Sequence, residues 1–140
     1  MQPFTVPEGY KILDRESAFS DLTGPYYEKR IDGVHIGLGL LIEQKHTNKI
    51  GIAHGGALIT LADNAFGDAV KNAFDEPVSF VTVTMNNELM VPARLGDWVE
   101  AEVEILRKGK RMLFVDCTLR IGDKKILHAS GVMALVNKPS

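Results

Sequence analysis

The residues best suited to do chemistry lie close together, between His54 and Asp63. The sequence His54-Gly55-Gly56 opens a long apolar segment, and Asp63 follows within it. The first N–H groups of a helix have no partner inside the helix and lie at the positive end of its dipole. Two glycines there let a ligand approach the backbone closely. The segment therefore suits a developing oxyanion, although tight packing of the helix start explains the glycines equally well.

Asp63 lies where a narrow polar strip of this segment meets its apolar side. An Asp on a mainly buried helix must be paired, hydrogen-bonded or functional. Such a carboxylate could attack an acyl carbon itself, or deprotonate a water that attacks it. A solvated Asp on the helix face is the structural alternative. The residues alone leave both interpretations open.

Hydrophobic periodicity predicts the elements that position these residues. A helix is expected from about Gly55 to Phe74, and its apolar residues fill most of the helical wheel, which indicates a buried helix. Alternation predicts a strand from Val34 to Glu43, with a loop over 45–54. Residues 1–30 read as an irregular lead-in with one short helix, from Asp14 as its N-cap to Asp21.

After the helix, alternating patterns predict four strands joined by short turns, over Val81–Asn86, Trp98–Leu106, Leu113–Ile121 and Lys125–Val136. Successive hairpins imply an antiparallel sheet. One buried helix then implies an α+β domain, with a curved sheet wrapped around one long central helix. Apolar residues on the other face of the sheet, Trp98, Met112 and Phe114, suggest a subunit interface.

The bulk properties narrow the possible functions. The chain has 140 residues, which fits one domain over 1–140, and its net charge of −2 gives no basic field to attract nucleic acid or anionic membrane. No apolar run approaches the ~20 residues that span a bilayer, and the first residues lack the features of a secretory signal. Cys117 is the only cysteine, so no disulfide can form within the chain. Its place on the inward face of an alternating strand predicts a core residue. We expect a cytoplasmic protein.

The loop from Asn48 to His54, the His-Gly-Gly opening, Asp63 and the strand Val81–Asn86 together resemble the PaaI-like branch of the hotdog-fold acyl-CoA thioesterase superfamily. The likeness runs from about Gly24 to Val136. It implies the hotdog fold and hydrolysis of an acyl-CoA, medium-chain or aryl, to the free acid and CoA. It also implies a homodimer, or a homotetramer built as a dimer of dimers.

The resemblance also implies roles for individual residues. Asn48 would order the attacking water or contact the thioester, and the Gly55 N–H would polarise the thioester carbonyl. Asp63 would be the nucleophile or general base. Thr82 would position the water from the partner subunit, so that Thr82 and the helix come from different chains. The substrate would also contact His54 and Gly56 at the helix start.

One dense basic cluster follows the strand that begins at Trp98, and it consists of Arg107, Lys108, Lys110 and Arg111. The resemblance places this hairpin near the CoA nucleotide, where Arg and Lys could pair with phosphates. A charged turn that only keeps the chain soluble is the alternative. For the acyl group, an apolar pocket is expected at Phe66, Val70 and Phe74.

Other functions fit the sequence less well. No Ser lies in the Gly-x-Ser-x-Gly turn of α/β-hydrolases, and His35, His46, His54 and His128 lack metal-ligand spacing. The sequence therefore predicts no metal and no cofactor. The main alternative to an enzyme is a module of the same fold that binds an acyl thioester or a hydrophobic carboxylate without cleaving it. A carboxylate beside the thioester carbonyl favours the enzyme.

Overall fold

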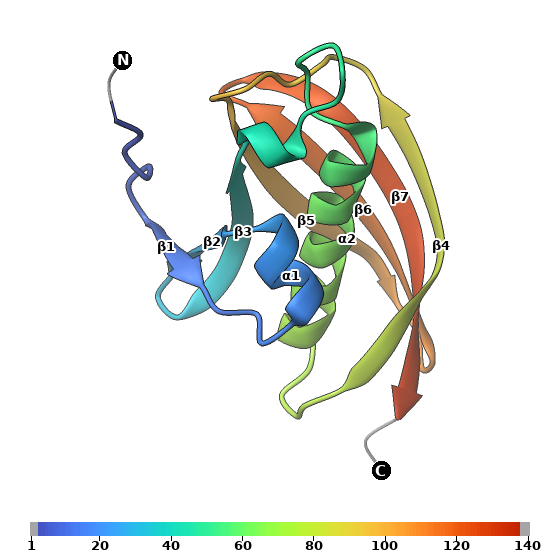
Figure 1. The fold of residues 1–140 in the computed structure, drawn as a ribbon. Coiled ribbons are helices and arrows are strands. Elements are labelled where there is room, and N and C mark those ends of the chain that lie inside the picture. Colours follow the sequence, from blue (N-terminus) through green and yellow to red (C-terminus); the bar gives the residue numbers. More distant parts are fainter. Residues whose placement is uncertain (1–2, 138–140) are drawn as a thin grey trace.

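The computed structural model describes residues 3–137. Its strands are β1 Tyr10–Leu13, β2 Tyr26–Ile31, β3 Val34–Leu41, β4 Ser79–Leu89, β5 Trp98–Lys108, β6 Met112–Ile121 and β7 Lys124–Asn137. Its helices are α1 Ala18–Thr23, the 3-10 turn η1 Gln44–His46 and α2 Gly55–Asn72. All strands join one antiparallel sheet in the order β1-β2-β3-β5-β6-β7-β4, which curves around α2 (Figure 1). The predicted α+β hotdog arrangement is confirmed.

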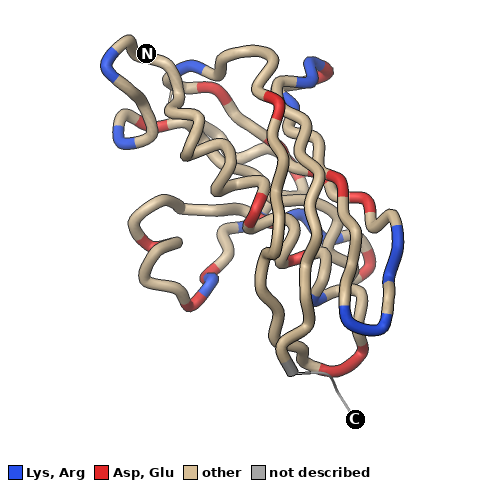
Figure 2. Tube along the Cα trace, turned by 90° about the vertical axis from the view of Figure 1, so that its right-hand side faces the viewer, with Lys and Arg blue, Asp and Glu red and all other residues tan. Residues whose placement is uncertain are grey.

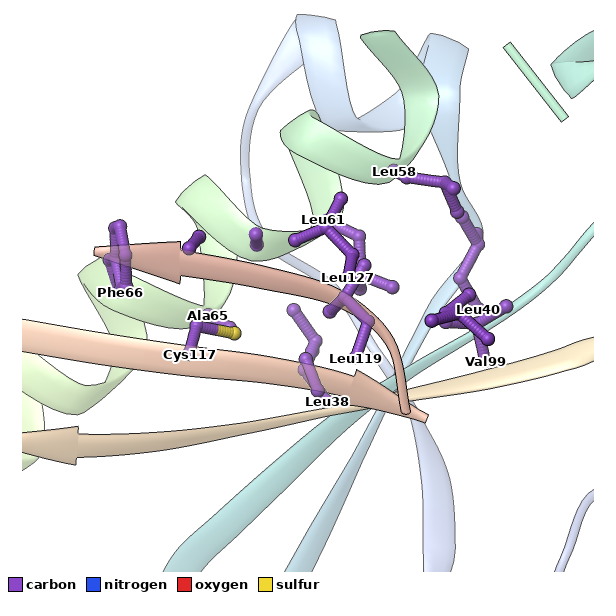
Figure 3. Close-up of a cluster of buried hydrophobic side chains, with 14 of the residues drawn as sticks. Leu38, Leu40, Leu58, Leu61, Ala65, Phe66, Val99, Cys117, Leu119 and Leu127 are labelled. Carbon is purple, nitrogen blue, oxygen red and sulfur yellow. The ribbon is translucent and has the colours of Figure 1, made fainter. Parts of the chain in front are cut away.

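The buried side of α2 forms the centre of the core. Leu58, Leu61, Ala65 and Phe66 are almost completely buried. They face strand residues from the concave side of the sheet, among them Leu38, Leu119 and Leu127 (Figure 3). A stripe of apolar residues at helical spacing therefore packs on the inward half of alternating strands, as expected. Within residues 3–137, no helix has both the length and the apolar character needed to cross a membrane.

The lead-in is more ordered than its sequence suggests, so the prediction of an irregular segment is wrong. β1 pairs with β2, and β2 pairs with β3. α1 begins after Ser17, whose hydroxyl accepts from the Ser20 N–H, whereas the Asp14 carboxylate accepts from the Glu16 N–H in a preceding turn. The charged residues Glu28, Lys29 and Arg30 interrupt the alternation of β2, which hides this strand from a periodicity argument.

Trp98 is covered by its own chain, which corrects the expectation that it belongs to a subunit interface. Its indole would collide with any Cβ at position 39, so Gly39 admits the ring. Phe4 stacks on Trp98 with ring centroids 5.5 Å apart, and Tyr10 and Tyr27 meet it edge-on. Met112 and Phe114 do remain exposed, by 44% and 40%.

β4 forms a free edge of the sheet. It pairs with the last strand, β7, and not with β5, so the four strands after α2 are not all successive hairpins. β4 is 11 residues long, and its Val81 and Val83 side chains are 51% and 49% exposed. A long apolar edge strand is a natural place for another chain to pair.

Cys117 has the structural role expected from its position in an alternating strand. It lies on the inward face of β6 and is almost fully buried. Burial raises the pKa of its thiol to about 12, so the group stays protonated at neutral pH. Cys117 therefore packs as a small hydrophobic residue.

His128 connects three strands on the outer face of the sheet. Its Nδ1 lies 3.0 Å from Glu88 Oε1 on β4, and its Nε2 lies 2.8 Å from Asp116 Oδ1 on β6. Hydrogen bonds to Glu88 and then to Asp116 raise the pKa of His128 above its ordinary value. The charged imidazole is therefore stabilised by the folded protein. Its contribution is complete below the unfolded pKa of about 6.5 and is lost as the pH rises through the folded pKa.

We therefore expect His128→Gln to lower the melting temperature by roughly one or two degrees more at pH 5.5 than at pH 9. The effect is small because the His128 side chain is partly exposed, and solvent weakens its ion pairs. The measurement is thermal unfolding of both proteins across this range. The same difference in melting temperature at every pH would show that His128 acts through packing and not through its charge.

Candidate active site

The start of α2 leaves one backbone donor available. His54 is the N-cap, and its Nδ1 accepts from the Gly56 N–H at 2.8 Å. Its carbonyl accepts from the Ala57 N–H at 2.9 Å. Among residues 3–137 the Gly55 N–H has no partner. The structure therefore leaves Gly55 able to bind an oxyanion, but the N–H of Gly56, one of the expected substrate contacts, is already used by His54.

Asp63 is held by a side chain from β4. The Thr82 hydroxyl donates to Asp63 Oδ1 at 2.6 Å, and both side chains reach the surface. Within the described chain, Asp63 Oδ2 has no hydrogen-bond partner. One carboxylate oxygen is thus fixed while the other can accept a proton or attack carbon. Because Thr82 and Asp63 meet within one chain, the expectation that Thr82 reaches the helix from a partner subunit is wrong.

Gly55 and Asp63 of one chain cannot act on the same carbonyl. They are eight residues apart on one straight helix, which places them about 12 Å apart along its axis at ~1.5 Å per residue. A reacting carbon must lie roughly 3–3.5 Å from its nucleophile, and the oxyanion about 3 Å from its donor. The structure therefore separates two residues that the sequence predicts to work together.

Asn48 shapes the loop that leads into α2. Its Oδ1 accepts from the Ile50 N–H at 3.1 Å and from the Ile52 N–H at 3.3 Å. This side chain therefore orders its own turn. In the part of the chain that the structure describes, its Nδ2 donates to no protein group, which leaves two N–H donors available to a ligand.

His46 anchors the same loop, a role that sequence reasoning missed. It is buried, its Nδ1 accepts from the Glu43 N–H at 2.9 Å, and its Nε2 donates to the Thr23 carbonyl at 2.5 Å. Its own carbonyl accepts from the His54 N–H at 2.7 Å. His46 thus ties the end of α1 to the N-cap of α2. The Glu43-x-x-His46 spacing was the available signal, because it resembles a capping box.

The acyl pocket expected at Phe66, Val70 and Phe74 is wrong for Phe66 and Val70. Phe66 and Val70 have no exposed surface, because they fill the core between α2 and the sheet. Phe74 lies beyond the end of α2, and the Lys108 ammonium lies 4.1 Å from the centre of its ring. Phe66 and Val70 therefore leave no open space for an acyl chain at their own positions in the described chain.

The four basic residues of the hairpin are all exposed but differ in their contacts, because Lys108 also bonds to the end of α2. Lys108 donates to the Ala73 carbonyl at 2.7 Å and so caps the end of α2, a structural role that the sequence did not predict. Arg107, Lys110 and Arg111 are exposed, and the hairpin appears as a run of blue in Figure 2. The hairpin lies at the end of α2 opposite to Gly55, roughly 27 Å away along the helix. No group of three His, Cys, Asp or Glu residues between 3 and 137 could hold a metal ion.

Known proteins match the chain closely. The sequence pattern of the thioesterase superfamily matches residues 50–127. The PA0474 protein of Pseudomonas aeruginosa is 38% identical over 130 residues, which cover 93% of this chain and 97% of that protein. Human acyl-coenzyme A thioesterase 13 is 37% identical over 98 residues, which cover 69% of each chain.

Solved structures share the fold. PA5202 from Pseudomonas aeruginosa superposes with a TM-score of 0.78 at 29% identity, over 87% of this chain and 98% of that one. The Escherichia coli PaaI protein superposes with a TM-score of 0.68 at 20% identity, over 73% of this chain and 72% of that one. The sequence match and the shared fold confirm the family expected from the His-Gly-Gly and Asp63 motif. The chain belongs to the thioesterase superfamily of hotdog-fold enzymes.

Proposed function

We propose that this protein hydrolyses acyl-CoA thioesters to the free acid and CoA. The observation that carries the proposal is the Asp63 carboxylate, which lies outside the buried stripe of α2, with one oxygen held by Thr82 and the other without a partner in the described chain. A binding module has no need of an anion beside a thioester. The name of the human relative, acyl-coenzyme A thioesterase 13, supports CoA as the leaving group.

The active site in this proposal is built from two copies of the chain. Gly55 and Asp63 are about 12 Å apart on one helix, so a second α2, running antiparallel, must bring its Gly55 to the first Asp63. A twofold axis then makes two identical sites, because each chain gives to its partner what it receives. The free edge at β4, which carries Thr82 between the exposed Val81 and Val83, supports this pairing.

A homodimer is then the smallest active unit, and a homotetramer of two such dimers keeps the same sites. In each site, Asp63 and Thr82 come from one subunit, while Gly55 and Asn48 come from the other. This division differs from the one expected from sequence, which separated Thr82 from the helix.

Hydrolysis follows from these groups. The thioester oxygen accepts from the Gly55 N–H, which polarises the acyl carbon. A water attacks that carbon while Asp63 Oδ2 takes its proton, and the tetrahedral oxyanion is held by Gly55. Collapse breaks the C–S bond, the thiolate takes the proton, and acid and CoA leave. In the nucleophilic variant Asp63 attacks the carbon directly, and water then hydrolyses the resulting anhydride.

The remaining residues fit supporting roles. The Asn48 amide can donate to the thioester or the attacking water, because its Oδ1 already orders the loop. Arg107, Lys110 and Arg111 are exposed cations for the phosphates of CoA. The end of α2 that their hairpin reaches is only about 15 Å along the helix from Asp63 of the same chain. The hairpin would therefore serve the site that contains its own Asp63.

The direct test is release of free CoA, followed with a thiol reagent, from a panel of acetyl-, butyryl-, octanoyl-, decanoyl- and phenylacetyl-CoA. The proposal expects turnover of at least one member of the panel. No release from any acyl-CoA, together with acyl-CoA binding in calorimetry, would replace it with the non-hydrolytic binding module.

A further inference from the structure

A groove beside the start of α2 has no part in the chemistry above. Its volume is about 390 Å³, within the range of roughly 300–1,000 Å³ typical of small-molecule sites. One wall is α1, which contributes Phe19 and Leu22, and the other is the first turns of α2, with Ala57. Phe19 and Leu22 are 58% and 73% exposed. Two large apolar side chains on a six-residue helix thus face a cavity and not the core.

Several of the polar residues that line the groove have already formed hydrogen bonds inside the protein, whereas Lys45, which also lines it, is exposed. The Thr60 hydroxyl donates to the Gly56 carbonyl at 2.7 Å, and the Thr23 hydroxyl lies 2.8 Å from the Tyr26 hydroxyl. Both ring nitrogens of His46 are occupied by backbone groups. Thr60, Thr23 and His46 therefore offer mainly methyl groups and ring carbons to a ligand, so the wall between α1 and α2 is more apolar than its composition suggests.

The groove begins where the thioester is expected to lie. His54 and Gly56, the neighbours of Gly55 on either side, both line it. A thioester whose oxygen accepts from the Gly55 N–H would lie beside this mouth, and its acyl chain could enter the groove there. Covering Phe19 and Leu22 with an aliphatic chain removes apolar surface from water.

We propose that this groove binds the acyl chain of the substrate and that Phe19 and Leu22 make the enzyme prefer medium-length aliphatic chains. The inference rests on the proposed thioesterase function. It assigns substrate selection to α1, a part of the chain outside the region that matches the superfamily pattern. Each methylene that the groove buries should improve kcat/KM by roughly fourfold, up to the length of the groove.

The test compares kcat/KM for butyryl- and decanoyl-CoA in wild type and in the double variant Phe19→Ala, Leu22→Ala. We expect a loss of about tenfold or more with decanoyl-CoA and a change within about twofold with butyryl-CoA. Ala57→Phe fills the groove from the opposite wall without altering α1, and it should give the same selective loss. Val34→Ala is the matched control, because Val34 is 58% exposed, as Phe19 is, but lies at the start of β3; it should change neither substrate.

Equal losses with both substrates, or none, would overturn this inference while leaving the thioesterase activity standing. Equal losses accompanied by a change of oligomeric state in light scattering would assign Phe19 and Leu22 to a contact between copies. If wild type hydrolyses no acyl-CoA, the proposed function fails. Calorimetry of acyl-CoA binding then tests separately whether the groove holds the acyl chain. The inference would still be supported if the double variant bound decanoyl-CoA more weakly than wild type but bound butyryl-CoA equally well. It would be refuted if both proteins bound decanoyl-CoA equally well.

Discussion

Asp63→Asn is expected to lower kcat for acyl-CoA hydrolysis by about a hundredfold or more, the usual cost of losing a general base or nucleophile. Asn has nearly the same shape as Asp, and its amide oxygen can still accept from the Thr82 hydroxyl, which now lies 2.6 Å from Asp63 Oδ1. It can neither take a proton from water nor attack an acyl carbon. Because Asp63 is only half-buried and makes no ion pair in the described chain, we expect the melting temperature to change by a few degrees at most, roughly.

The measurements are initial rates of CoA release and a thermal unfolding curve for each protein. Asp123→Asn is the matched control, since this carboxylate is exposed in the turn between β6 and β7 and belongs to neither α2 nor β4. It should retain wild-type kcat. An Asp63→Asn protein that keeps more than about a third of wild-type kcat would remove Asp63 from the chemistry.

Gly55→Pro is expected to reduce kcat by about a hundred- to a thousandfold, the typical effect of removing one oxyanion donor. Gly55 is the first residue of α2, a position that tolerates Pro because its N–H is not part of the helical ladder. The preceding residue, His54, has φ −61° and ψ 134°, an extended conformation that is compatible with a following Pro. The substitution therefore removes the donor and preserves the helix.

Gly55→Ala distinguishes the loss of the N–H donor from the effect of the added side-chain volume, because Pro causes both and Ala only the second. A Cβ at position 55 would lie 2.9 Å from Leu89 Cδ2, and both variants introduce that atom. Ala retains the N–H, so we expect it to keep far more activity than Pro. The comparison is kcat for both proteins, with circular dichroism to check their helix content. Equal activity of the two variants would mean that the N–H plays no part and that only the space at position 55 matters.

Much of the fold is predictable from the sequence because its signals are local. The apolar residues of α2 recur at helical spacing, and β5, β6 and β7 alternate over most of their lengths, so both kinds of element follow from periodicity. β2 was missed because Glu28, Lys29 and Arg30 interrupt its alternation. The pairing of β4 with β7 was missed because strand order depends on contacts between distant segments, which no local pattern records.

The candidate site divides in the same way. Gly55 and Asp63 are proposed as site residues from their types and their positions in the first half of an amphipathic helix, and this part stays a prediction. That Thr82 meets Asp63 within one chain depends on the position of β4 beside α2, and that His46 anchors the loop depends on the fold of α1. That Lys108 caps the end of α2 is equally hidden, because a charge in a turn gives no sign that it reaches the end of a helix.

The central claim is that each active site combines Asp63 of one subunit with Gly55 of the other. Mixing the Asp63→Asn and Gly55→Pro proteins under conditions that exchange subunits tests it directly. Each variant alone is nearly inactive, but every mixed dimer contains one site with both native residues. The claim predicts recovery of about a quarter of wild-type activity, because half of the dimers are mixed and half of their sites are intact. No recovery, with subunit exchange verified by mass spectrometry, would contradict it and show that Asp63 and Gly55 do not act together in a site between subunits.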